Sequence, residues 1–396
     1  MLVRDVTVNG RTYGWPANRL VVVCLDGSAF EYIDRAIVAG AAPFLSSLMN
    51  WGFFRLVHSA LPSITNPNNA SIVTGVPPAV HGIIGNFFLD RVTGEAVMMN
   101  DASFLRAETI LSAFSRAGAH VAIVTAKDKL RRLLCHDVDG PCMSIEETGV
   151  EVYSAALSER ALAESVRLLE STAPDIMYVS TSDYVQHKHA PGEAAANQFY
   201  AAVDRSLAAI DRLGATLVVT ADHGMRAKTD AAGRVRAVFL QDVLDEWLGP
   251  SVARVVLPIT DPYVRHHGSL GSCAMVYLGA EPMVVDASTL AERINGLRGI
   301  DVAVARAEAC KRFDLPLDRT GDIVVFADAD TVVGTRSGEH DLSALDAPLR
   351  SHGGRAEQQV PMLVNRPSGD IALAAGTRLH NYDAFDVGLN RSESSC

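Results

Sequence analysis

Short apolar runs recur along the chain, and segments with helical periodicity lie between them. Within each run most successive positions are apolar, which is typical of a central parallel strand that is buried on both faces. The runs cover residues 19–24, 120–125, 176–181 and 216–221. Residues 193–213 give the clearest helical pattern, and Gly214 follows as a helix C-cap. Strands that alternate with helices predict an open α/β sheet with helices on both faces.

The pattern becomes less regular after about residue 250. Residues 252–259, 272–278 and 323–327 predict further strands, with weaker helical segments between them. A last strand is predicted at residues 360–364, shortly after a segment that contains His352. We therefore expect an inserted or appended subdomain, after which the chain returns to the main sheet.

The composition is that of a well-packed globular protein. The 396 residues are 48% hydrophobic and 20% charged, which excludes disorder as the main state. This length predicts roughly two to three domains, or one large domain with an insertion. The net charge is −11, so we expect neither nucleic acid nor a membrane as a partner. An anionic ligand would need a local positive centre, such as a metal ion or a few placed lysines.

The sequence also bears on compartment and redox state. No apolar run reaches the ~18 residues that a membrane-spanning helix requires. Residues 1–18 are polar and lack the apolar stretch of a signal peptide, so we expect a cytoplasmic protein. The six cysteines are scattered and contain no C-x-x-C pair, and we expect each to be a reduced thiol.

Acidic and histidine residues follow three of the predicted strands. Asp26 comes directly after the first run. Asp183 follows the third run, and His187 lies four residues further on. Asp222 and His223 follow the fourth run. Because ligand sites in open α/β sheets lie beyond the carboxyl ends of the strands, we expect these side chains to meet at one edge.

With the remote His352, the candidate set holds three carboxylates and three imidazoles. These groups are ordinary zinc ligands, and six are too many for one tetrahedral ion. They suit two sites of three ligands each, with open positions for a substrate. Taken singly, an aspartate at a strand end is more often the cap of the next helix. The set as a whole favours a dinuclear metal site.

Thr65 is the candidate nucleophile. It follows a strand predicted at residues 54–60 and opens a helix predicted at residues 66–75. A hydroxyl at a helix N-terminus faces free backbone N–H groups and the positive end of the helix dipole. Beside a metal ion such a hydroxyl loses its proton more easily and becomes nucleophilic. The alternative is that Thr65 only caps the helix.

These motifs, taken in order, resemble the alkaline phosphatase superfamily, and most of all its nucleotide pyrophosphatase/phosphodiesterase-like branch. The resemblance extends from residue 20 to about residue 365 and rests on the segments VVCLDG, LPSITNPNNASIVTG, HGIIGN, DYVQH, TADHGM and SHGG. It implies an alkaline-phosphatase-like, mostly parallel sheet with helices on both faces, plus a smaller α+β cap subdomain. We place the core at residues 1–254 and 346–396 and the cap at residues 255–345.

Within that superfamily the chain is similar to the phosphonoacetate hydrolases, through the further segments TAKDKLR, SDYVQHKHAPG and LRSHGGRAEQQVP. The resemblance implies an enzyme that cleaves the carbon–phosphorus bond of phosphonoacetate, a small anion, to acetate and phosphate. It implies two Zn²⁺ ions per chain and a phosphothreonine formed on Thr65. One ion would be held by Asp26, Asp222 and His223, and the other by Asp183, His187 and His352. Asn86 would bind a phosphonyl oxygen, and Lys127 and Lys129 the substrate carboxylate.

Several alternatives stay open. Without the resemblance, Lys127-Asp-Lys129 would be a solvated turn. His189 is a surplus histidine that we expect in an outer position or facing solvent. The nearest rival function is a dizinc phosphodiesterase or nucleotide pyrophosphatase of the same superfamily. A phosphoglycerate-mutase-like enzyme would use serine in place of Thr65, and a catalytically silent zinc-binding protein is the most distant rival. The sequence does not give the oligomeric state, and a homodimer is one option.

Overall fold

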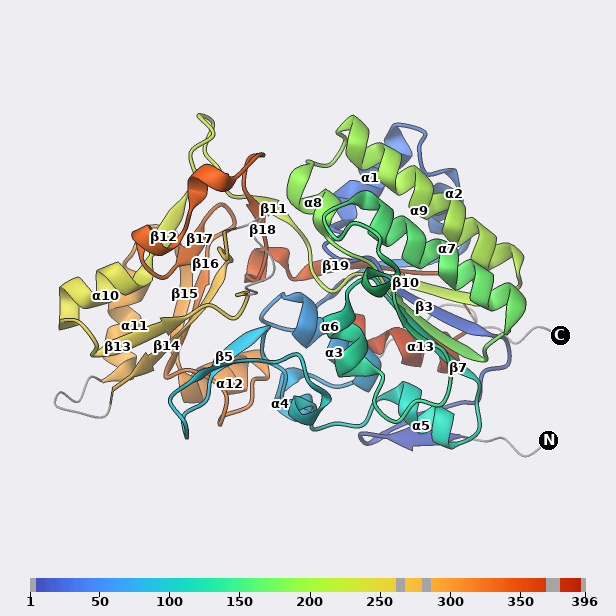
Figure 1. Cartoon of the computed structure of the whole chain (residues 1–396), viewed down its shortest axis with the longest axis horizontal. Helices are drawn as coiled ribbons and strands as arrows, with labels where there is room; N and C mark the ends of the chain where they lie inside the picture. The colour runs from blue at the N-terminus through green and yellow to red at the C-terminus, as the bar shows by residue number, and fades with distance from the viewer. Residues whose placement is uncertain (1–4, 261–267, 280–285, 368–377, 393–396) are drawn as a thin grey trace.

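The computed structural model describes residues 5–260, 268–279, 286–367 and 378–392. Two units lie side by side (Figure 1), a larger one around a seven-stranded sheet and a smaller one around a four-stranded sheet. Within the described residues, no helix is long and apolar enough to cross a membrane.

The large sheet has the strand order β4-β19-β10-β3-β9-β7-β8. Its strands are β3 (Leu20–Cys24), β4 (Phe53–His58), β7 (Val121–Thr125), β8 (Cys142–Ser144), β9 (Ile176–Ser180), β10 (Thr216–Thr220) and β19 (Gln359–Val364). The five strands from β10 to β8 run parallel, and β19 runs antiparallel to both of its neighbours. The predicted mostly parallel sheet is therefore confirmed, and the predicted apolar runs are its central strands.

Helices cover both faces of this sheet because its central strands are apolar on both faces. In β3 the side chains of Val21 and Val23 join one hydrophobic cluster, and those of Val22 and Cys24 join the other. The hydrophobic cluster that contains Val21 and Val23 includes residues of α1 (Phe30–Val38), α2 (Pro43–Trp51), α7 (Ala155–Ser171) and α9 (Ala194–Arg212). The hydrophobic cluster on the other face includes residues of α3 (Thr65–Thr74), α5 (Ile110–Arg116), α6 (Asp128–Leu134) and α13 (Ala384–Asn390). Figure 1 shows these two helical layers above and below the sheet.

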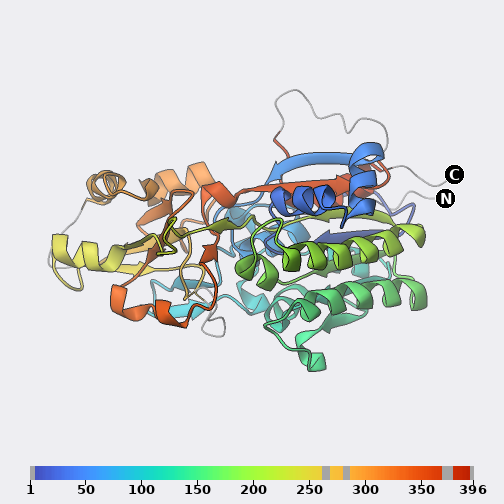
Figure 2. The same cartoon turned by 90° about the horizontal axis from the view of Figure 1, so that it is seen from above.

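The smaller unit is built on an antiparallel sheet of order β13-β14-β16-β15. Its elements are α10 (Leu240–Leu248), β13 (Ala253–Val256), β14 (Cys273–Leu278), α11 (Ala287–Asn295), β15 (Ile300–Ala305), α12 (Arg306–Phe313) and β16 (Ile323–Ala327). Beside them β12 (Ala237–Phe239) pairs with β17 (Val332–Gly334). Figure 2 shows this unit extending away from the layers of the large sheet.

The chain enters and leaves the smaller unit at one place. There β11 (Arg226–Ala227) pairs antiparallel with β18 (Arg350–Ser351). Leu240 and Leu244 of α10 pack into the core of the smaller sheet, although the expected boundary at residue 254 assigns this helix to the larger unit. We propose that the subdomain boundaries lie at β11 and β18.

The remaining elements are small. They include the hairpin β1 (Val6–Val8) and β2 (Arg11–Tyr13), the pair β5 (Phe87–Leu89) and β6 (Ala96–Met98), and the short helices α4 (Pro78–His81) and α8 (Tyr184–Lys188). The expectation that every cysteine is a free thiol is wrong. Cys135, at the end of α6, forms a disulfide with Cys142, at the start of β8. The cause is the short connection between these elements, which brings their Cα atoms to 6.2 Å.

Candidate active site

Three neighbouring strands deliver acidic residues to one edge of the large sheet. In the order β10-β3-β9, the residues just beyond the strands include Asp222, Asp26 and Asp183. All three carboxylates are buried, with exposures of 0%, 0% and 4%. The strands are parallel, so their carboxyl ends meet at this edge, where ligand sites of open α/β sheets are found.

One cluster of possible metal ligands consists of Asp26, Asp222 and His223. One ligand atom from each residue lies within 4.8 Å of the others. His223 Nε2 is 3.3 Å from Asp26 Oδ1 and 3.8 Å from Asp222 Oδ2. Two carboxylates and one imidazole around a small space form a donor set that suits a divalent metal ion.

A second cluster consists of Asp183, His187 and His352. Asp183 Oδ2 lies 3.0 Å from His187 Nε2 and 3.7 Å from His352 Nε2. The two clusters are adjacent, because the rings of His223 and His352 stack with their centroids 3.5 Å apart. The structure thus brings the six candidate ligands together in two groups of three.

The three histidines share a hydrogen-bonding pattern that directs Nε2 toward the clusters. In each ring Nδ1 lies at hydrogen-bond distance from a backbone carbonyl oxygen. The pairs are His223 with Gly224 at 2.9 Å, His187 with Arg350 at 2.8 Å, and His352 with Ser63 at 2.9 Å. A carbonyl can only accept, so Nδ1 donates and Nε2 of a neutral ring keeps its lone pair. Metal-binding histidines are oriented in this way.

The electrostatics of the first cluster favour a bound cation. Neither carboxylate oxygen of Asp26 accepts a hydrogen bond from any residue that the structure describes. Burial, followed by repulsion from Asp26, raises the pKa of Asp222 to about 8. Burial lowers the pKa of His223, but the carboxylates of Asp222 and Asp26 outweigh this effect and raise it to about 9. Two buried carboxylates that repel each other, one of them without a hydrogen-bond donor, are the environment that a divalent ion would stabilise.

At the second cluster, burial raises the pKa of Asp183, but the positive charges of Lys127 and His187 outweigh it and hold the pKa well below its usual range. Burial and the neighbouring histidines lower the pKa of His352 well below its ordinary value. These directions favour an ionised carboxylate and a neutral imidazole. Metal ligation requires these two forms.

Thr65 is the first residue of α3 and lies against the first cluster. Its Oγ1 is 3.3 Å from His223 Nε2, and the residue is 4% exposed. One turn further on, Asn69 donates to the backbone oxygen of Thr65 at 3.0 Å and to Asp222 Oδ2 at 3.1 Å. The side chain of Asn69 is held by Tyr178, whose hydroxyl donates to it at 2.7 Å. Sequence reasoning missed Asn69, although its i, i+4 spacing from Thr65 was a usable signal.

Lys127 contacts carboxylates of both clusters. It precedes α6, and its Nζ lies 3.0 Å from Asp183 Oδ1 and 3.6 Å from Asp26 Oδ2. Lys127 is 9% exposed, so it is part of the buried site. Lys129 lies partly buried in the first turn of α6.

Asn86 joins the two units of the molecule. Its backbone N–H donates to the carbonyl oxygen of Pro258 at 2.8 Å, and its Nδ2 donates to that of Ile259 at 3.1 Å. Both partners lie just after β13 of the smaller unit. His189 lies near the surface, with Nδ1 3.1 Å from a carboxylate oxygen of Glu193, as expected for a histidine that faces solvent.

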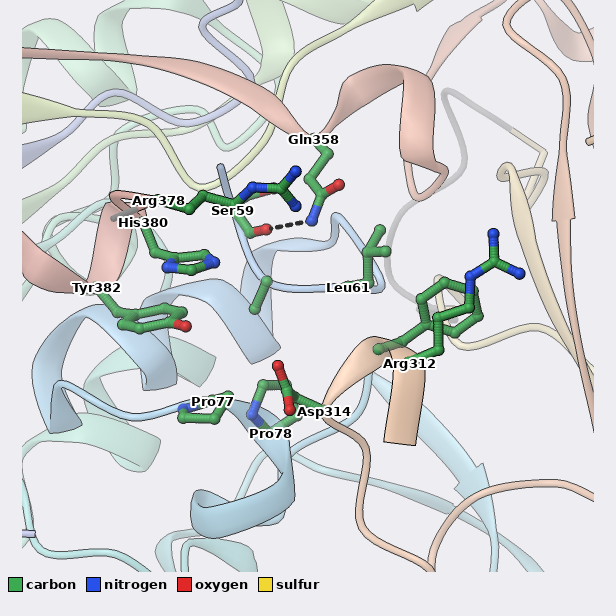
Figure 3. Close-up of a pocket in the computed structure, with 12 residues that line it drawn as sticks. Ser59, Leu61, Pro77, Pro78, Arg312, Asp314, Gln358, Arg378, His380 and Tyr382 are labelled. Atoms are coloured by element: carbon green, nitrogen blue, oxygen red, sulfur yellow. Dashed lines mark hydrogen bonds between the residues drawn. The ribbon is translucent and has the colours of Figure 1, made fainter. Parts of the chain in front are cut away.

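A separate cavity of about 80 Å³ lies beside the segment that leads to Thr65 (Figure 3). It is lined by residues of that segment, including Ser59 and Leu61, and by His380 and Tyr382, whose rings stack 4.5 Å apart. None of the candidate site residues lines it.

The fold and the two clusters can now be compared with known proteins. The chain matches the type I phosphodiesterase / nucleotide pyrophosphatase family over residues 20–355. It is 51% identical to the phosphonoacetate hydrolase of Sinorhizobium meliloti, whose crystal structures contain phosphonoacetate or phosphonoformate. That alignment covers 99% of this chain and 100% of the other, with a TM-score of 0.93.

Two more distant comparisons cover a short part of the sequence or share the fold. A pyrophosphatase/phosphodiesterase from Schizosaccharomyces pombe is 42% identical over 81 residues, which are 19% of this chain and only 15% of that protein. The murine ectonucleotide pyrophosphatase/phosphodiesterase 5 shares the fold, with a TM-score of 0.66 and 18% identity over 95% of this chain and 96% of that one.

The chain belongs to the type I phosphodiesterase / nucleotide pyrophosphatase family of the alkaline phosphatase superfamily. Within that family it groups with the phosphonoacetate hydrolases, and it shares half of its residues with the Sinorhizobium meliloti enzyme over nearly its whole length.

Proposed function

We propose that this chain hydrolyses the carbon–phosphorus bond of phosphonoacetate to give acetate and phosphate. The observation that carries the proposal is the pair of three-ligand clusters, with the Thr65 hydroxyl against one and Lys127 touching both. A substrate with a phosphonate at one end and a carboxylate at the other matches this arrangement. The similarity to the Sinorhizobium meliloti enzyme supports the same reaction.

We propose two Zn²⁺ ions as the cofactors, because aspartate and histidine are ordinary zinc ligands. Asp26, Asp222 and His223 would hold one ion, and Asp183, His187 and His352 the other. Aspartate and histidine also accept manganese or iron, so the metal must be identified by measurement. When bound, such ions polarise phosphonyl oxygens and lower the pKa of hydroxyl groups beside them.

In the proposed reaction the Thr65 oxygen attacks phosphorus in line with the carbon leaving group. The Thr65 O–P bond forms as the P–C bond breaks, and the carbon keeps the electron pair. The Thr65 hydroxyl loses one proton in this attack, and the leaving carbon gains one proton to become the methyl group of acetate, so the step balances. Water cleaves the phosphothreonine, which releases phosphate and restores the Thr65 hydroxyl. Asn86 would donate to a phosphonyl oxygen during these steps.

The leaving carbon makes this reaction difficult, and the lysines address that difficulty. As the P–C bond breaks, negative charge moves into the adjacent carboxylate, as in an enediolate. A cation beside this carboxylate stabilises the charge as it develops. Lys127 and Lys129 lie beyond the carboxyl end of β7, and we propose that they bind the substrate carboxylate.

Metal removal tests the cofactor assignment. We expect the purified chain to hold two ions per molecule and to lose phosphonoacetate hydrolysis when a chelator strips them. Added Zn²⁺ should restore the activity. His187→Ala should lower the metal content to one ion per chain by elemental analysis, because its cluster keeps only two ligands. His189→Ala is the matched control, because His189 belongs to neither cluster, and it should keep both ions. A chelated protein that keeps full activity would contradict the proposal.

The family match favours one second candidate, a phosphodiesterase or nucleotide pyrophosphatase that uses the same two metal clusters and Thr65. Such an enzyme has no need of the lysine pair, since its leaving group is an oxygen. Comparing substrates therefore separates the two functions.

A further inference from the structure

Lys228 and Glu357 form an ion pair that is closed off from solvent. Lys228 Nζ lies 2.9 Å from Glu357 Oε1, and both side chains are 0% exposed. The two residues are 129 positions apart in the chain. Transferring two charges out of water often costs more free energy than their mutual attraction returns. A buried pair of this kind is weak evidence for added stability. Its hydrogen bonds indicate a different role.

Glu357 is hydrogen-bonded to the segments that carry His223 and His352, one histidine of each cluster. Its Oε2 accepts from the backbone N–H of Gly354 at 3.0 Å, two residues after His352. Its backbone oxygen accepts from the N–H of Gly224 at 2.7 Å. Gly224 in turn accepts from Nδ1 of His223 at 2.9 Å. One residue thus anchors the backbone beside a ligand of each cluster.

Lys228 pairs with Glu357 at the place where the two units join. Its Nζ also donates to the carbonyl oxygen of Ala329, beyond β16 of the smaller unit, at 2.9 Å. Its backbone N–H donates to the carbonyl oxygen of Leu349 at 2.8 Å. Lys228 directly follows β11, and Leu349 directly precedes β18. These paired strands lie between the two units (Figure 1).

We propose that Glu357, whose charge Lys228 balances, is a positioning residue that fixes the spacing of the two metal clusters. His223 belongs to one cluster and His352 to the other, and their rings stack at an interplanar angle of 6°. Relative movement of their two segments would change the distance between the clusters. Neither Lys228 nor Glu357 belongs to a cluster, so the pair acts through backbone. This inference rests on the proposed metal-dependent function.

The test replaces the ion pair in two ways. K228M/E357L replaces both charged side chains by apolar ones and removes the acceptor for the Gly354 N–H. Apolar replacement of a buried ion pair is often neutral or stabilising, so the melting temperature should not fall. K228M/E357Q also removes both charges but keeps a side-chain oxygen that can accept from Gly354. Arg355→Met is the matched control, because Arg355 lies in the same turn and pairs with Asp301 at the surface.

We expect K228M/E357L to bind Zn²⁺ about 10–100-fold more weakly in chelator competition, the range typical of residues that orient metal ligands. Its visible spectrum with Co²⁺ should change, and kcat should fall while KM for phosphonoacetate changes little. K228M/E357Q and Arg355→Met should resemble the wild type in all of these measurements.

Wild-type zinc affinity and an unchanged Co²⁺ spectrum in K228M/E357L would overturn the inference. So would equal weakening in K228M/E357Q, because the effect would then belong to the lost charges rather than to the hydrogen bond. If K228M/E357L fails to fold, weakened zinc binding by K228M/E357Q would still overturn the inference. A wild-type chain that binds no Zn²⁺ would instead refute the proposed function, and the inference with it.

Discussion

Replacing Thr65 by alanine should reduce phosphonoacetate turnover on the order of 10⁴-fold or more, as the loss of a covalent nucleophile does in other hydrolases. The reason is that the substitution removes Thr65 Oγ1, the attacking oxygen, which lies 3.3 Å from His223 Nε2 at the first cluster. Because Thr65 is not among the six cluster ligands, Thr65→Ala should keep its metal ions. Phosphate release and elemental analysis of the same preparation would measure both effects.

Thr65→Ser is the matched control for this prediction. It keeps the hydroxyl at the start of α3 and should retain substantial turnover. Rapid quenching of the wild-type reaction should trap phosphate on Thr65. Near-normal turnover by Thr65→Ala would mean that water attacks phosphorus directly.

Replacing Lys127 by alanine should impair phosphonoacetate hydrolysis far more than hydrolysis of an aryl phosphate ester. Loss of one group that stabilises developing negative charge typically costs about 10²–10³ in rate. The aryl ester has an oxygen leaving group that needs no such help. Because Lys127 also contacts Asp26 and Asp183, the substitution could disturb the metal sites. The ratio of the two activities in one preparation cancels that disturbance.

Two further variants serve as a second test and as a control for the Lys127 measurement. Lys129→Ala should show the same substrate selectivity of its loss, because both lysines are assigned to the substrate carboxylate. Lys311→Ala, at an exposed position of α12, should leave both activities unchanged. Equal losses on the two substrates in Lys127→Ala would refute the assignment.

The arrangement of the large sheet was predictable because its signal is local. Residues 20–24 and 176–180 are apolar on both faces, which only a sheet covered on both sides can bury. The rule that ligands gather at the carboxyl ends of such strands then placed Asp26, Asp183 and Asp222 at one edge. The assignment of particular ligands to each cluster came only from the resemblance to a family, because no local signal links the remote His352 to Asp183 and His187.

Features that depend on distant contacts were not predictable in this way. The Cys135–Cys142 disulfide requires the end of α6 to meet the start of β8, and no spacing motif in the sequence predicts this pairing. Lys228 has the sequence appearance of a surface residue, yet it is buried against Glu357 because the chain returns beside β11. The role of Asn69 was not predicted because α3 contains several other small polar residues, although Asn69 donates hydrogen bonds to both Thr65 and Asp222.

The most direct test of the account is phosphate release from phosphonoacetate by the zinc-loaded chain, measured beside an aryl phosphodiester. We predict rapid release from phosphonoacetate and little turnover of the diester. Turnover of the diester alone would contradict the carbon–phosphorus chemistry and the roles of Lys127 and Lys129, and would leave the metal clusters and Thr65 to a phosphodiesterase.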